Sequence, residues 1–172
     1  MAERQSHGFE YEKIVSENND LSLTENYTGI WDAYNTQSVP YLIKTFKKGS
    51  EIPLSDIFIN CQRNRDFYLA IGIWESNPNN IVEEYLLLVE GEKFTKLFEF
   101  SYMEEMKNWI KTVSNHHEYD SQWKKDCKEW KLKWGKDRIV QPRFKRDHKK
   151  QKRIQSAVSY KNINKFLEII AK

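Results

Sequence analysis

The sequence predicts an α+β (α/β) domain in which a mixed central sheet is flanked by helices and followed by a basic C-terminal part. Apolar stretches of strand length occur between segments of helical periodicity along the 172 residues. Hydrophobic residues make up 39% of the chain and aromatic residues 14%, which is enough to fill a core and excludes a disordered tail. There is no internal repeat or low-complexity linker, so residues 1–172 are expected to form a single domain.

The first third of the chain is expected to form a helix, two strands and a second helix. Phe9 and Ile14 have near-helical spacing, whereas the apolar runs after them have strand length and are separated by a polar turn. Pro40 is expected to start a strand or lie at a sheet edge, and Pro53 to open a helix. The expected elements are a helix at 5–17, strands at 27–34 and 39–46, and a helix at 53–64.

The remainder begins with a strongly apolar strand and ends with a helix. Trp123, Trp130 and Trp134 recur at helical spacing, and this stripe is expected to be core and not a stacking platform for bases. The expected elements are strands at 66–75 and 84–89, a segment 94–100 after a turn, helices at 103–113 and 123–134, short strands at 139–140 and 154–158, and a closing helix at 162–171.

The formal net charge of +3 conceals a strong asymmetry. Residues 123–153 contain 14 Lys and Arg but only 4 Asp and Glu. The rest of the chain contains 14 Lys and Arg and 21 Asp and Glu. A segregated basic block of this kind is typical of proteins that bind polyanions, although a solvated basic helix face would look the same.

Composition also excludes several classes of protein. The sequence has no apolar leader and no run of about 18 apolar residues, so we expect a soluble, cytoplasmic protein that does not enter a membrane. Cys61 and Cys127 have no Cys or His partner at metal-ligand spacing, which excludes a zinc finger and argues against a structural disulfide.

The stretch GIWDAYNTQSVPYLIK, residues 29–44, carries the residues best suited to chemistry. An aspartate on one strand and a lysine on the next can meet across the ladder, and Asp32 and Lys44 fit that arrangement. Carboxylates bind Mg²⁺, and a lysine is a suitable point charge beside a phosphate. Each residue also has a simpler interpretation, because Asp32 could belong to a turn and Lys44 could protect an edge strand from aggregation.

Five stretches together resemble the PD-(D/E)XK nuclease superfamily, and in particular small type II restriction endonucleases. GFEYE is similar to the family's first helix, with Glu12 in the acidic position; GIWDAY resembles the strand of the metal-binding aspartate, Asp32; and VPYLIKT resembles the strand that ends in the catalytic lysine, Lys44. GSEIPLSDIF and RFKRDHKKQKRIQSAV also resemble a small subfamily of these enzymes. The resemblance implies a restriction-endonuclease-like fold, with a catalytic core at 1–115 and a basic part at 116–172 that is the candidate for DNA binding.

The sequence departs from the family pattern at one position. An acidic residue is expected two positions before the lysine, and Leu42 stands there, which cannot bind metal. Three explanations are open. Another carboxylate could replace the missing one, with Asp56 and Glu51 as candidates; a backbone carbonyl and waters could suffice beside Asp32 and Glu12; or the protein could have lost its activity.

The resemblance implies a Mg²⁺-dependent, sequence-specific endonuclease that hydrolyses phosphodiester bonds in double-stranded DNA. Its catalytic residues would be Asp32, Lys44, Glu12 and Asp56, and the three acids would hold the metal. A restriction enzyme of this kind usually acts as a homodimer on a palindrome and has a separate cognate methyltransferase. The alternatives are a homing or repair nuclease of the same superfamily and a non-catalytic DNA-binding protein.

The basic block supplies the candidates for contacts with DNA. Lys and Arg can neutralise phosphates, while Arg and Gln can also read base edges. The candidate residues are Arg143, Lys145, Arg146, Lys149, Lys150, Gln151, Arg153 and Gln155.

Overall fold

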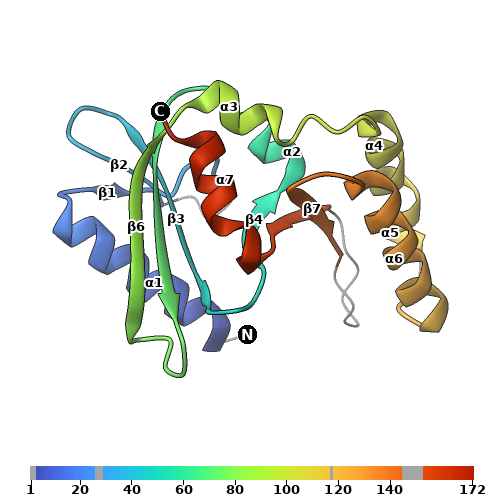
Figure 1. The fold of residues 1–172 in the computed structure, drawn as a ribbon, viewed down its shortest axis with the longest axis horizontal. Coiled ribbons are helices and arrows are strands. Elements are labelled where there is room, and N and C mark those ends of the chain that lie inside the picture. Colours follow the sequence, from blue (N-terminus) through green and yellow to red (C-terminus); the bar gives the residue numbers. More distant parts are fainter. Residues whose placement is uncertain (1–2, 26–28, 117, 145–152) are drawn as a thin grey trace.

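The protein folds as two sheets with helices around them, as seen in a computed structural model that describes residues 3–25, 29–116, 118–144 and 153–172 (Figure 1). The main sheet contains β1 (Ser22–Leu23), β2 (Ala33–Tyr34), β3 (Pro40–Lys47), β5 (Phe67–Trp74) and β6 (Ile81–Val89). The small sheet contains β4 (Ile52–Asp56), β7 (Val140–Arg143) and β8 (Gln155–Val158). The helices are α1 (Glu3–Asn18), α2 (Ile57–Asn60), α3 (Gly91–Lys96), α4 (Met103–Lys111), α5 (Val113–His116), α6 (Ser121–Gly135), the 3-10 helix η1 (Tyr160–Asn162) and α7 (Ile163–Ile170).

The main sheet is mixed, as the sequence predicted. Its strands follow the order β1-β2-β3-β5-β6, with β3 and β5 parallel and the other neighbours antiparallel. The parallel pair arises because the chain leaves β3 for β4 in the small sheet, passes through α2 and returns along β5. Parallel neighbours require such a crossover. Pro40 is the first residue of β3, where its missing N–H costs the ladder little.

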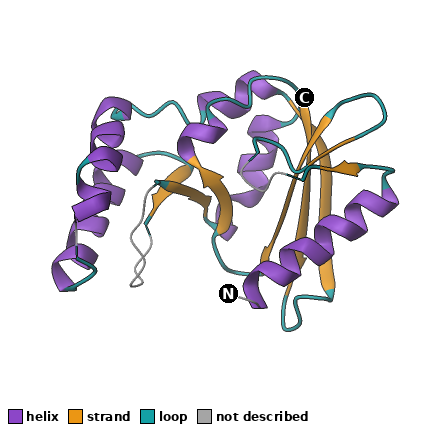
Figure 2. Cartoon of the chain, turned by 180° about the vertical axis from the view of Figure 1, so that it is seen from behind, coloured by secondary structure: helices purple, strands orange, loops and turns teal. Residues whose placement is uncertain are grey.

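The two faces of β5 explain how the main sheet is covered. Leu69, Ile71 and Ile73 are fully buried in the main core. On the other face, Ala70 and Gly72 leave room for α1, because a Cβ on Gly72 would lie 2.6 Å from the ring of Tyr11. Figures 1 and 2 show α1 on one face of this sheet and α7 on the other.

The closing helix α7 and the small sheet both bring the last part of the chain into contact with the first part. Phe166 and Ile170 of α7 are fully buried in the same core cluster as Phe94 and the β5 side chains. In the small sheet, β8 lies between β4 and β7. The boundary predicted at residues 115 and 116 is therefore crossed by a sheet and by the main core.

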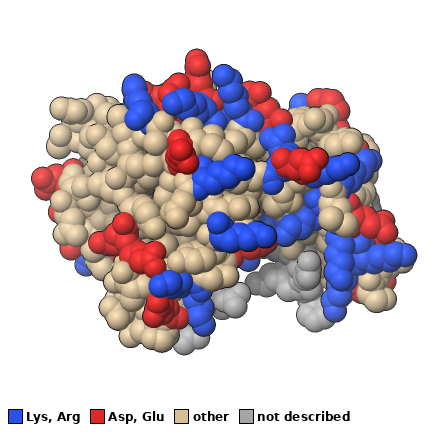
Figure 3. Space-filling view, viewed as in Figure 1, with Lys and Arg blue, Asp and Glu red and all other residues tan. Residues whose placement is uncertain are grey.

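Helices α4, α5 and α6 form a helical arm beside the small sheet, on the right of Figure 1. The stripe of Trp123, Trp130 and Trp134 packs with Trp109 and Phe144, with ring centroids 5.3–6.5 Å apart. Trp123 and Trp134 are almost completely buried, which confirms that the stripe is core. Figure 3 shows basic side chains gathered over this arm.

Three local predictions were wrong. The helix expected at 53–64 is strand β4 followed by the short α2, because Ile52 and Leu54 alternate into the core and Pro53 lies on the edge strand of the small sheet, where a missing N–H is tolerated. The turn expected at 90–93, before the segment 94–100, is instead the start of α3, which spans Gly91–Lys96. The strand expected at 27–34 is reduced to β2 within the described residues.

Two further expectations can be compared with the structure. No disulfide joins Cys61 and Cys127 in the described residues, as the sequence led us to expect. In the described ranges, no helix is long and apolar enough to cross a membrane.

Candidate active site

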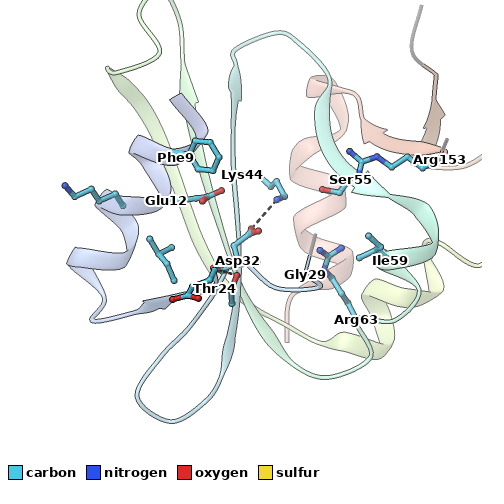
Figure 4. Close-up of a pocket in the computed structure, with 13 residues that line it drawn as sticks. Phe9, Glu12, Thr24, Gly29, Asp32, Lys44, Ser55, Ile59, Arg63 and Arg153 are labelled. Atoms are coloured by element: carbon cyan, nitrogen blue, oxygen red, sulfur yellow. Dashed lines mark hydrogen bonds and ion pairs between the residues drawn. The ribbon is translucent and has the colours of Figure 1, made fainter. Parts of the chain in front are cut away.

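A pocket of about 630 Å³ opens between α1, β3, the end of β4, α2 and Arg153, which lies two residues before β8 (Figure 4). Charged side chains of both signs line it, namely Glu12, Glu25, Asp32, Lys13, Lys44, Arg63 and Arg153. Three of the four predicted catalytic residues, Glu12, Asp32 and Lys44, therefore meet in one cavity although they come from a helix, a loop and a strand.

Asp32 is held in place by three hydrogen bonds with the neighbouring strand β3. It immediately precedes β2, and its backbone N–H donates to the carbonyl of Tyr41 at 3.0 Å. Its carboxylate oxygen Oδ2 accepts the backbone N–H of Ile43 at 2.7 Å and the Nζ of Lys44 at 3.2 Å. The predicted meeting of Asp32 and Lys44 is observed, but the aspartate lies just outside the strand.

Lys44 is held with its charge beside Asp32. Alternation along β3 puts Leu42 and Lys44 on one face, and the Leu42 side chain is fully buried in the main core. Lys44, two residues after Leu42 on the same face, lines the pocket. Its side chain is 16% exposed there, and that of Asp32 is 23% exposed. Such partial burial strengthens the ion pair, because less water screens it.

Glu12 faces the same pocket from α1, where it is half-buried. Burial raises the pKa of its carboxyl from 4.5 to about 7, the negative charge of Asp32 adds to this rise, and Lys44 opposes it. The ionised form of Glu12 is therefore costly in the metal-free pocket, mainly because burial removes its charge from water. A divalent cation would supply compensating positive charge, and Mg²⁺ commonly binds through one or two carboxylates and several waters.

Asp56 lies in a different environment. Its Oδ1 accepts the backbone N–H groups of Phe58 at 2.8 Å and Ile59 at 3.1 Å, so it caps α2. Glu51, the other candidate to replace the missing acid, pairs with Lys131 at 2.9 Å and with Arg143 at 3.8 Å. Neither carboxylate is among the residues that line the pocket.

These placements bear on the three explanations for Leu42. With Asp56 and Glu51 bonded elsewhere, Glu12 and Asp32 are the carboxylates best placed for a metal ion. This arrangement favours ligation by two acids completed by waters and a backbone carbonyl. The described part of the chain contains no cluster of three or more His, Cys, Asp and Glu side chains that could hold a metal.

Arg63 belongs to the site and was missed by sequence reasoning. Its side chain lines the pocket, yet the residue is only 2% exposed. Nε donates to the carbonyl of Ile30 at 2.9 Å, Nη1 donates to Asn60 Oδ1, and the guanidinium lies 5.5 Å from the ring centroid of Trp31. Burial lowers its pKa to about 10, against the pull of Asp32 and Asp56, so it is charged at neutral pH.

A buried polar chain continues from Arg63 to the small sheet. Asn60 donates to the carbonyl of Leu54 at 2.6 Å and to Ser156 Oγ at 3.2 Å, and Ser156 donates to the carbonyl of Ser55 at 2.7 Å. The segment that carries Asp32 is thereby connected to the small sheet, whose strand β8 begins two residues after Arg153. No local motif predicts such a chain, because its partners are up to 101 positions apart in sequence.

The predicted DNA-binding residues are only partly described. Arg153 lines the pocket. Arg143 lies on β7, exposed, opposite the half-buried Gln155 of β8. The other five candidates, Lys145, Arg146, Lys149, Lys150 and Gln151, lie outside the described residues.

No known protein-family model matches the chain, and no curated protein matches it in sequence. The function is therefore inferred from the site itself.

Proposed function

We propose that the protein is a Mg²⁺-dependent, sequence-specific endonuclease of double-stranded DNA, as the resemblance to small type II restriction endonucleases implies. One observation carries the proposal: Glu12, Asp32 and Lys44, separated by up to 32 positions in sequence, meet in one pocket. Two acids can hold a divalent metal ion, and a lysine can stabilise the negative charge that develops on a phosphate, so the three groups suit metal-dependent hydrolysis of a phosphodiester.

Glu12 and Asp32 would hold the metal. Bound there, Mg²⁺ would lower the pKa of a water molecule and polarise the phosphoryl oxygens. Asp32 is prepared for this role, because the Ile43 N–H and Lys44 fix its carboxylate before any ligand arrives. Glu12 would lose its proton on metal binding, since a nearby cation stabilises the ionised carboxylate.

Lys44 would act on the phosphate. Its Nζ is oriented by Asp32, and its positive charge faces the pocket where the scissile phosphate would lie. Negative charge develops on the phosphoryl oxygens during hydrolysis, and a fixed cation stabilises it without reorganisation. One P–O bond of the backbone breaks; water supplies the hydroxyl to phosphorus and a proton to the leaving oxygen.

The biological setting follows from the enzyme class. We propose that it works in the cytoplasm as a homodimer on a short palindrome, and that a separate methyltransferase protects the host's own sites. The closest rival is a DNA-binding protein without activity. The observation that favours it is Leu42, whose burial in the core leaves no acidic residue at that place on β3.

Digestion of unmethylated phage DNA tests the proposal. Wild type with Mg²⁺ should give discrete fragments, while addition of EDTA, Asp32→Asn or Lys44→Met should abolish them. Lys47→Ala is the matched control, because Lys47 lies on the same strand but is exposed. A salt-sensitive gel shift without any cleavage by wild type would instead establish the inactive DNA-binding protein.

A further inference from the structure

Ser55 has a backbone conformation that serine rarely adopts. Its φ is +66°, in the left-handed region, where a side chain crowds the backbone. It lies at the end of β4, where the register against β8 shifts between Pro53 and Asp56. Strained residues of this kind persist only where the surrounding structure enforces them, and they cluster at functional sites.

Buried groups enforce the conformation of Ser55. Ser156, which is fully buried, donates its hydroxyl to the Ser55 carbonyl at 2.7 Å. Asn60, also fully buried, holds that hydroxyl at 3.2 Å and the Leu54 carbonyl at 2.6 Å. The result is that Ser55 lines the pocket.

Ser55 and Arg153 form a side of the pocket distinct from its acidic side. In Figure 4, both lie on the side of Lys44 away from Glu12, and the guanidinium of Arg153 points toward Ser55. A hydroxyl donor beside a guanidinium suits an anion, and the positive charge of the guanidinium disfavours a metal ion there.

We propose that Ser55 and Arg153 bind one backbone phosphate of DNA, next to the phosphate that is cleaved. This inference rests on the proposed nuclease function and adds the contact that positions the strand in the pocket. Phosphate contacts of this kind fix the register of a protein on DNA without reading its sequence.

The test is a double-mutant cycle on DNA affinity, measured by anisotropy of a fluorescein-labelled duplex in EDTA over a range of salt concentrations. Ser55→Ala should weaken binding about ten- to a hundredfold, as expected for a hydrogen bond to a charged group. It should leave the salt dependence unchanged, because a hydroxyl releases no counterions. Arg153→Gln should reduce the slope of log K against log salt by about 0.9, the value for one phosphate. The double variant should lose less binding free energy than the two single variants lose together, because both groups hold one phosphate.

Glycine and a second serine provide controls. Ser55→Gly should raise the melting temperature, because it relieves the strain, and should still weaken binding as Ser55→Ala does. Ser38 has φ +60°, is exposed and does not line the pocket. Ser38→Gly should likewise raise the melting temperature, and both Ser38→Ala and Ser38→Gly should bind DNA like wild type.

Two outcomes would overturn the inference, and they are distinguishable. If wild type cuts DNA with Mg²⁺ but the Ser55 variants bind like their Ser38 counterparts, the strain at Ser55 serves only the turn into α2, and the subsite is rejected. If wild type neither binds nor cuts DNA, the proposed function itself fails.

Discussion

Replacement of Glu12 by glutamine should make the protein more stable and inactive at the same time. Glu12 is half-buried beside Asp32, which raises its pKa from 4.5 to about 7. Its folded-state pKa lies above the unfolded value, so the stability it contributes is complete below pH 4.5 and is lost as the pH rises through 7. At pH 8 the metal-free folded protein therefore carries an ionised carboxylate that is less stable there than in the unfolded chain.

The size of the effect follows from the pKa. A pKa change of one corresponds to about 1.4 kcal/mol, so the rise sets an upper limit of about 3 kcal/mol. Partial exposure of the carboxylate lowers the expected gain for Glu12→Gln to about 1–2 kcal/mol at pH 8. For a domain of this size, that gain corresponds to a melting temperature about 2–8 °C higher.

Urea unfolding in EDTA at pH 5 and pH 8, followed by tryptophan fluorescence, measures this difference. Glu12→Gln should unfold at higher urea than wild type at pH 8, and the difference should shrink at pH 5. Mg²⁺ should stabilise wild type at pH 8 and have much less effect on the variant. Glu17→Gln is the matched control, since Glu17 lies on the same helix with its side chain 66% exposed. A variant that is less stable than wild type at pH 8, or a gain that does not change with pH, would refute the reasoning.

Three further substitutions test the packing that positions the site, each by urea unfolding. Arg63→Met should destabilise the protein by about 3 kcal/mol, because the Ile30 carbonyl and Asn60 Oδ1 lose a buried charged donor. A loss below about 1 kcal/mol would show that water replaces the guanidinium as donor. Gly72→Ala should cost about 1–3 kcal/mol, because its Cβ would overlap the Tyr11 ring, and an unchanged midpoint would mean that α1 moves freely. Leu42→Asp should unfold the protein or cost more than about 3 kcal/mol, since it buries an unpaired charge; a stable variant that binds Mg²⁺ more tightly than wild type would contradict this.

Sequence periodicity predicted the elements whose burial repeats regularly. Strands β3, β5 and β6 and helices α4, α6 and α7 were expected within a few residues of their observed bounds. The prediction failed where one residue supports two local structures. Pro53 can open a helix or occupy an edge strand, and only its pairing with Ala157, more than a hundred positions away, decides between them.

The residues of the site likewise divide into those that the sequence predicted and those that it did not. Asp32 and Lys44 were predictable, because they flank a short turn and strand pairing brings such residues together. Ser55 and Arg63 were not, because their roles depend on a left-handed backbone and on buried partners from distant segments. Asp56 was expected to bind metal, a role that nothing observed supports; its carboxylate caps a helix.

The most direct test of the central claim is to sequence the DNA ends that the protein produces with Mg²⁺. All ends from wild type should share one short sequence, and Lys44→Met and Asp32→Asn should produce none. Ends at random positions, or the same ends from the Lys44 variant, would contradict a sequence-specific nuclease that acts through Glu12, Asp32 and Lys44.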